Sequence, residues 1–262
     1  MAKALSRESV ENQLCLATAA EYRERRQRTR ELFLGELRRV IEEQSRALES
    51  LPRLYRVLVE VAPPPLIISA TYDLVLERFL EEQGKTYVLV CHVVRSYKGM
   101  EDGKILVFRN KKPEICLADK IDLRGFDYVI YKPLGSPLLH DLTDPEAEID
   151  TVVMTEADHL LFLSRLEHES TQIPSAFSRL LQRRPLLFAG YDLDVWQYRL
   201  VTLVFHLIGA EARSMAVRKP ASAMEELAWA RLGTDLIRLE TDAFAEHVLS
   251  ALAPMGRSAY GH

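Results

Sequence analysis

Three short stretches of this sequence place polar and flexible residues directly after an apolar run. They read SATYD, KPLGSP and AGYDLD. Glycine at the end of a strand lets the backbone approach a phosphate or a ribose closely, and the start of the following helix favours an anion. The stretches therefore predict a site for a phosphorylated ligand. Its candidate residues are Ser69, Thr71, Asp73, Lys132, Gly135, Ser136, Gly190 and Tyr191.

Each stretch on its own also has a structural explanation. Asp73 is at least as suited to cap the helix that follows it as to bind a ligand, and Gly190 is as suited to a tight turn. The cysteines offer no alternative chemistry. They lack a nearby pattern of histidine and asparagine, which argues against a thiol nucleophile, and they lack the spacing of metal ligands. We therefore expect no metal site.

The elements that must position these residues follow from the apolar patterning. Short apolar runs alternate with segments of helical periodicity from residue 66 to residue 252. This alternation predicts an α/β fold class: a Rossmann-like, mostly parallel sheet with helices on both faces, preceded by an α-helical N-terminal region. The strands are expected within residues 66–70, 86–94, 104–110, 126–133, 151–154, 185–194, 214–219 and 234–240.

In such sheets the ligand lies at the carboxyl ends of the strands. We therefore expect Asp73, Gly135 and Gly190 to lie near one another at that edge. Apolar runs without alternation suit strands that are covered on both faces, so three of the runs are predicted to be interior strands. These runs are residues 66–70, 127–131 and 186–191.

The same patterns suggest how the chain is organised. Residues 1–62 are predicted to form a helical region that packs on the rest of a single domain. Residues 63–253 are predicted to form its core, and residues 254–262 a tail.

Composition excludes several classes of protein. The formal net charge of −4 gives no reason to expect a nucleic-acid partner. No apolar stretch reaches the about 18 residues that a membrane span needs, and the N-terminus lacks the apolar core of a signal peptide. The three cysteines, Cys15, Cys91 and Cys116, form an odd and scattered set that is typical of reduced thiols. These observations predict a cytoplasmic protein without a membrane segment.

In their order along the chain, several stretches resemble one family. LIISATYDLVLERFL resembles the TTNYD-x-x-LE segment of bacterial sirtuin-like domains, and YKPLGSP resembles their YKxHGS segment. TEADHLLFL is similar to the helix that follows, and PLLFAGYDLDVWQYRLV is closer still to LLFLGYSLxDWxxR. AWARLGTDLIRLETDAFAEHVLSAL resembles the usual closing strand and helix. The chain is thus similar, over roughly residues 10–252, to sirtuin-like domains of bacterial antiphage defence systems.

The resemblance implies an NAD-binding, Rossmann-like fold, and active members of the family hydrolyse NAD. Three departures weaken that expectation. The catalytic histidine of the family aligns with Leu134, which can neither accept a proton nor polarise a ribose hydroxyl. The asparagine of TTNYD aligns with Thr71, whose hydroxyl cannot replace both functions of an amide. The first strand and the GAGxS loop, which hold the dinucleotide phosphates in the family, are not found in the sequence.

We therefore predict a catalytically silent pseudoenzyme that binds a nucleotide or a protein in a bacterial defence or signalling assembly. A protein partner or a second copy of the chain is expected, and NAD would be the nucleotide. One alternative is an active NAD hydrolase whose missing strand and loop come from upstream sequence or from a partner. Another is an unrelated Rossmann-like binding protein. His140, six residues after Leu134, is a weaker candidate for a substitute base.

Overall fold

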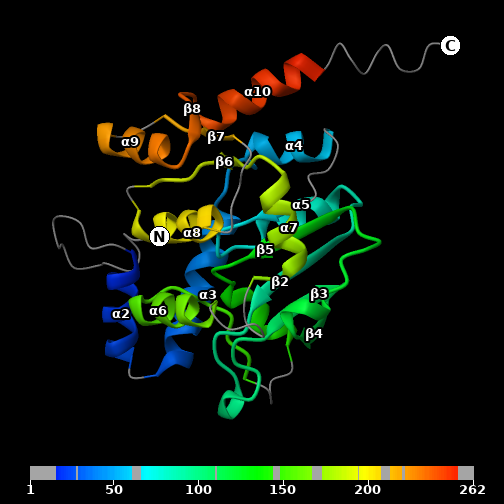
Figure 1. Cartoon of the computed structure of the whole chain (residues 1–262). Helices are drawn as coiled ribbons and strands as arrows, with labels where there is room; N and C mark the ends of the chain where they lie inside the picture. Colours follow the sequence, from blue (N-terminus) through cyan, green and yellow to red (C-terminus); the bar gives the residue numbers. More distant parts are fainter. Residues whose placement is uncertain are drawn as a thin grey trace. The chain divides into compact units, whose positions relative to one another are not determined.

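The structure is a computed structural model, and it divides the chain into two compact units (Figure 1). The first unit comprises residues 1–48 and 65–179, and the second comprises residues 49–64 and 180–262. Our expected boundary after residue 62 is a different division and stays a prediction. The predicted tail at 254–262 lies outside the described residues. These are residues 16–27, 29–60, 66–109, 111–143, 148–166, 173–193, 195–207, 213–219 and 222–252.

The first unit contains a five-stranded sheet of order β1-β5-β2-β3-β4. Strands β1, β5 and β2 run parallel, whereas β3 and β4 continue the sheet as an antiparallel pair. All side chains of β5 are buried, as are nearly all of β2, so helices and loops must cover both faces of the sheet there. The strands are β1 (Ile67–Ile68), β2 (Tyr87–His92), β3 (Ile105–Arg109), β4 (Lys112–Cys116) and β5 (Tyr128–Lys132).

The helices of the first unit begin and end where local signals place them. Thr29 caps α3 and Thr155 forms a capping box with Asp158 at the start of α6, as the threonine and the acidic first turn predict. Gly84, with φ of 66°, follows α5. The helices are α2 (Leu16–Gln27), α3 (Arg30–Arg46), α5 (Val75–Glu82) and α6 (Glu156–Arg165), with short 3₁₀ turns η1 (Tyr97–Gly99), η2 (Ala118–Lys120) and η3 (Pro137–Leu142). Helix α7 (Ser175–Arg183) contains the boundary between the two units.

The second unit contains three parallel strands in the order β6-β7-β8. Its core is built around Trp229, which is fully buried with Leu193 and Ala216. Helix α4 lies against α10, where the Arg53 backbone N–H donates to the Asp242 carboxylate at 3.0 Å. The elements are α4 (Arg53–Glu60), β6 (Leu187–Ala189), α8 (Trp196–Leu207), β7 (Ser214–Val217), α9 (Ala223–Arg231), β8 (Thr234–Ile237) and α10 (Thr241–Leu252).

The α/β class, the mostly parallel strands, the flanking helices and the helical N-terminal region are confirmed. Two of the three predicted interior strands are wrong. In the described part of the chain, β1 is the end strand of the first sheet and β6 the end strand of the second, while β5 is interior as predicted. No helix among the described residues has both the length and the apolar character that crossing a membrane requires.

The structure differs from the predicted strands in two further segments. Residues 151–154 form no strand, because their backbone bonds to a turn and a side chain: Val153 N–H donates to Leu134 O at 3.1 Å, and Tyr72 Oη donates to Val153 O at 2.7 Å. Strand β4 was not predicted, because its exposed Lys112, Pro113 and Glu114 carry no apolar signal.

Candidate functional site

The first two polar stretches meet at one edge of the first sheet. Ile68 of β1 pairs with Tyr131 of β5 in parallel, and Ser69 N–H donates to Tyr131 O at 2.9 Å. The carboxyl ends of the two strands therefore lie side by side. This register brings Ser69 and Thr71 to Lys132, as the rule for parallel sheets predicts.

The Lys132 ammonium is the centre of this edge, and protein groups surround it. Its Nζ donates to Asp73 O at 2.8 Å and to Ser69 Oγ at 3.3 Å, and lies 3.5 Å from Thr71 Oγ1. The carboxylate of Glu77 forms an ion pair with it at 3.3 Å. Both charged side chains are buried, with 0% and 3% of the side chain exposed for Lys132 and Glu77. The cation that could bind a phosphate is thus already neutralised within the protein.

Glu77 was not found from the sequence, although it completes the cluster. Burial raises the pKa of its carboxyl group, and the adjacent Lys132 ammonium opposes that rise. Glu77 lies on α5, which also carries Glu81 and Glu82. The sequence pattern alone does not distinguish a buried glutamate from an exposed one on the same helix.

Asp73 serves the helix rather than a ligand in this structure. Its Oδ1 accepts a hydrogen bond at 3.0 Å from the backbone N–H of Val75, the first residue of α5. The neighbouring hydroxyls of Ser69 and Thr71 are 3.1 Å apart and bond to each other. The structural explanation of Asp73, which the sequence left open, is therefore the one that the contacts support.

The strand-end turn, residues 133–136, is closed by hydrogen bonds of its own. Ser136 is buried, and its Oγ donates to Tyr72 O at 2.5 Å while accepting from Leu138 N–H at 3.2 Å. The Thr151 hydroxyl accepts from Ser136 N–H at 3.2 Å and donates to Ser136 O at 3.1 Å. Every polar group of Ser136 thus has a protein partner.

Gly135 is required by packing as well as by its backbone conformation. Its φ is 63°, in the left-handed region that favours glycine. A Cβ atom at this position would lie 1.8 Å from Thr151 O, far inside van der Waals contact. Gly135 therefore makes room for the backbone of Thr151, a part of the protein itself.

Leu134 occupies the position that the resemblance assigns to a catalytic histidine. Only 1% of the residue is exposed, so its side chain belongs to the core of the first unit. His140 lies on η3, where its Nδ1 contacts Ile149 O at 3.2 Å. Since a carbonyl can only accept, this contact holds the proton on Nδ1 and ties the ring to the 148–150 segment.

The third polar stretch lies in the second unit. Gly190 has φ of 69°, and the half-buried Tyr191 packs against Phe188 and Tyr198, with ring centroids 5.7 and 5.3 Å away. Burial raises the pKa of the Tyr191 hydroxyl. The prediction that Gly190 shares one site with Asp73 and Gly135 stays a prediction, because the two units are described separately.

The second unit also holds a cation that sequence reasoning missed. Arg218, just after β7, forms an ion pair with Asp192 at 2.9 Å and a second one with the buried Glu225. Ser222 caps α9, and its Oγ accepts from Glu225 N–H at 3.1 Å. The only signal in the sequence is that a basic residue follows an apolar strand.

Two cavities lie in the first unit, and one of them reaches Glu77, the partner of Lys132. One, of about 290 Å³, is lined by apolar residues that include Leu74, Phe108 and Leu139 and, in equal measure, by polar and charged residues that include Glu77. The other, of about 270 Å³, is lined by charged residues that include Arg30 and Arg95. Neither is lined by the candidate residues of the two strand ends in this unit.

Comparison with known proteins identifies one family. The model of the SIR2-like domain family matches residues 65–237, a range that runs from just before β1 to the end of β8 and follows α2, α3 and α4. No curated protein matches the chain.

Proposed function

This chain belongs to the SIR2-like domain family, and we propose that it is a catalytically silent member that acts by binding. In this proposal it works in a bacterial defence or signalling assembly in the cytoplasm, with a protein partner or a second copy of the chain. It would bind a partner protein or a nucleotide such as NAD without cleaving it.

The observation that carries the proposal is the buried Leu134. Cleaving the bond between nicotinamide and ribose builds positive charge on the ribose, and a base that manages the ribose hydroxyls or the attacking water assists the reaction. The aliphatic side chain of Leu134 can do neither, and with 1% exposure it lies in the core instead of facing a substrate. Loss of general acid–base help alone typically costs about 10²–10⁴ in rate.

The groups around Leu134 support the same proposal. The Lys132 ammonium and the hydroxyls of Ser69 and Thr71 bond to one another, and the Asp73 carboxylate accepts from the Val75 N–H at the start of α5. A ligand would have to break these contacts before it could use the groups, and it would leave Glu77 as an unpaired buried carboxylate.

The test is nicotinamide release from NAD by the purified full chain, alone and with candidate partner proteins. We expect no turnover above the uncatalysed background. Turnover at about 1 s⁻¹ or faster, an ordinary enzyme rate, would show that the chain is an active hydrolase and contradict the proposal.

A substitution sharpens the assay. Leu134→His restores the side chain of the family, but we expect it not to restore cleavage, because positioning groups can supply roughly 7–11 kcal/mol and Lys132, Ser69 and Thr71 stay bonded to each other. Leu134→Met, which nearly conserves volume, is the matched control for folding. Calorimetric titration with NAD then separates nucleotide binding from protein binding.

A further inference from the structure

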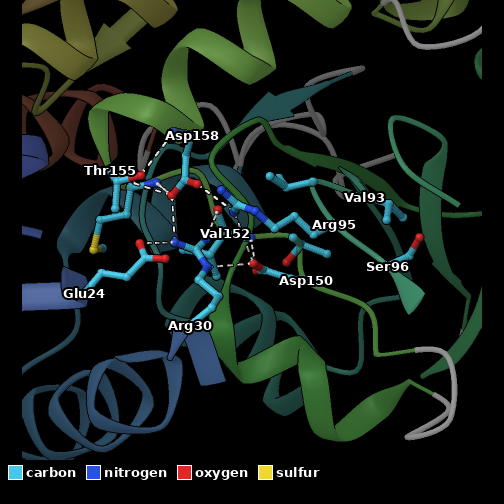
Figure 2. A network of polar contacts seen from close by, with 12 residues as sticks. Glu24, Arg30, Val93, Arg95, Ser96, Asp150, Val152, Thr155 and Asp158 are labelled. Carbon is cyan, nitrogen blue, oxygen red and sulfur yellow. Dashed lines mark hydrogen bonds and ion pairs between the residues drawn. The ribbon is translucent and has the colours of Figure 1, made fainter. Parts of the chain in front are cut away.

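Arg30, the first residue of α3, makes a set of contacts that joins the N-terminal helices to a distant segment. Its Nε donates to Asp150 Oδ2 at 2.9 Å, its Nη1 to Asp158 Oδ2 at 2.9 Å and its Nη2 to Val152 O at 2.8 Å. Nη1 also donates to Glu24 of α2 at 3.0 Å. Figure 2 shows the guanidinium among these acceptors. One side chain thus holds both ends of residues 150–155, here called the support segment, and α2.

The Asp150 and Asp158 carboxylates of this network are buried, so their pairing with cations affects stability. Asp158 has no exposed side-chain surface, and it accepts from Met154 N–H and Thr155 N–H at 3.1 and 3.0 Å. Its other oxygen pairs with Arg95 at 2.7 Å. Burial alone raises the pKa of Asp158, but the charges of Arg30 and Arg95 outweigh that effect and hold the pKa below its usual value.

The support segment packs directly against the strand-end turn. Thr151 bonds to Ser136 through its hydroxyl, and its carbonyl lies where a Cβ of residue 135 would be. Val153 N–H donates to Leu134 O at 3.1 Å. Three contacts from two residues of the support segment therefore determine the shape of the turn.

We propose that Arg30 is a positioning residue that couples the N-terminal helices to the strand-end turn through the support segment. Release of the Arg30 guanidinium loosens residues 150–155, and the loosened segment in turn frees Leu134, Gly135 and Ser136. Helices α2 and α3 precede the range that the family model matches. The coupling would therefore let helices outside the SIR2-like domain act on a turn within it.

Two features make the network suited to release. It lies beside the charged cavity of about 270 Å³, which is lined by Arg30, Arg95, Thr29 and Thr155 among others, so the side chains have space in which to separate. It also joins residues by charge and hydrogen bonds, with 16% of the Arg30 side chain exposed, whereas β2 and β5 are held by an apolar core. A partner that pulls on α2 or α3 would act on the turn while the sheet stays intact.

Amide hydrogen exchange on the full-length chain tests the coupling. In Arg30→Met we expect exchange of Met154 and Thr155 to become at least about 10-fold faster, and exchange of Gly135 and Ser136 to follow, because local opening controls these rates. The amides of β2 and β5 should keep their wild-type rates. The matched control is Arg23→Met, which removes the ion pair between Arg23 of α2 and Glu36 of α3 and leaves the contacts of Arg30 with Asp150, Val152 and Asp158 in place.

Two outcomes would overturn the proposal. Unchanged exchange at Gly135 and Ser136, with faster exchange at Met154, would show that the network acts only on its own segment. Equal acceleration in β2 and β5 would show that Arg30 supports the whole unit without a specific link to the turn.

Two further variants keep the test decisive if Arg30→Met does not fold. Arg30→Lys keeps the charge but cannot reach all four acceptors, so we expect an intermediate acceleration at the same amides. Thr151→Val cuts the other end of the link, so Ser136 should exchange faster while Met154 stays slow. Acceleration of Met154 to the same degree as Ser136 in Thr151→Val would contradict the order of the coupling. This inference does not depend on catalytic silence, which nicotinamide release measures separately.

Discussion

The two units each end a strand with a glycine in the left-handed conformation, and the two glycines have opposite surroundings. Gly135 and Gly190 have φ of 63° and 69°. A Cβ at Gly135 would lie 1.8 Å from Thr151 O, whereas the nearest atom to a Cβ at Gly190 would be Thr241 Oγ1 at 3.9 Å. The first strand end is filled by the protein's own backbone, whereas a Cβ at the second would make only an ordinary van der Waals contact.

The comparison shows that one backbone conformation can serve two purposes. At Gly135 the missing side chain lets another segment pack closely, so the residue is structural. At Gly190 only the positive φ requires glycine, because a Cβ there would meet Thr241 Oγ1 at an ordinary van der Waals distance. A strand-end glycine is therefore evidence for a ligand only when the structure leaves its surroundings open.

The largest expected effect comes from filling the tight position. Gly135→Ala should lower the free energy of unfolding by about 5 kcal/mol, because the new methyl group meets a backbone carbonyl that cannot move without breaking the Thr151–Ser136 bonds. Urea unfolding followed by circular dichroism measures this. Both tryptophans of the chain, Trp196 and Trp229, belong to the second unit, so their fluorescence reports on that unit separately. A loss below about 1 kcal/mol, the scale of the φ effect alone, would contradict the packing argument.

The next effect concerns the charge at the filled strand end. Lys132→Met should cost about 4 kcal/mol of unfolding free energy, because Glu77 is left as an unpaired carboxyl group in the core. Adding Glu77→Leu should recover most of that loss, since an apolar pair of similar volume tolerates burial. Urea midpoints of the two variants decide this. If Lys132→Met barely changes the free energy of unfolding, the ion pair with Glu77 contributes little, and the Lys132 ammonium is available to bind a ligand.

A pH titration probes the core beneath that strand end. His92 of β2 is buried, and its Nε2 lies 2.7 Å from Tyr131 Oη. Burial, aided by the charge of Arg165, lowers the pKa of His92 from 6.5 to about 4. Between those values the unfolded chain binds a proton that the folded chain does not. Stability is therefore fully present above pH 6.5 and falls by about 3 kcal/mol as the pH drops to 4.

The measurement is urea unfolding at several pH values, with His92→Phe as the comparison. The variant should lose this part of the pH dependence, whatever its absolute stability. A wild-type profile with the same slope as His92→Phe would show that the folded protein protonates the ring without penalty.

The smallest expected effect is at the open glycine. Gly190→Ala should lower the free energy of unfolding by about 1 kcal/mol, the cost of placing an alanine at positive φ. Thermal unfolding followed by tryptophan fluorescence suits this variant, because the change lies in the second unit. A loss as large as that of Gly135→Ala would remove the contrast between the two strand ends.

Much of the local structure could be predicted from the sequence. The apolar runs at 86–94 and 126–133 contain strands β2 and β5, and Thr155 with Asp158 marks the start of α6. These signals are short-range: burial of consecutive residues, or a cap three residues from its partner. Strand β4 escaped prediction because its outer residues are polar and exposed.

The candidate site was predicted in part. Sequence order and the rule for parallel strands brought Ser69, Thr71 and Lys132 to one edge, and the register of β1 with β5 places them there. The same reasoning could not predict that Asp73 accepts a hydrogen bond from the first amide of α5, or that all polar groups of Ser136 bond within the protein. Whether a polar group faces a ligand or its own backbone depends on atoms far away in the sequence.

The sequence by itself determined the family and most of the alternation of strands and helices. Local patterns and residue identity suffice for these, because each can be read within a few neighbouring positions. Only the tertiary structure decided that Lys132 is neutralised by Glu77 and that Arg30 holds Asp150, 120 residues away. Burial and charge pairing arise when distant segments meet, and no local pattern records which segments will do so.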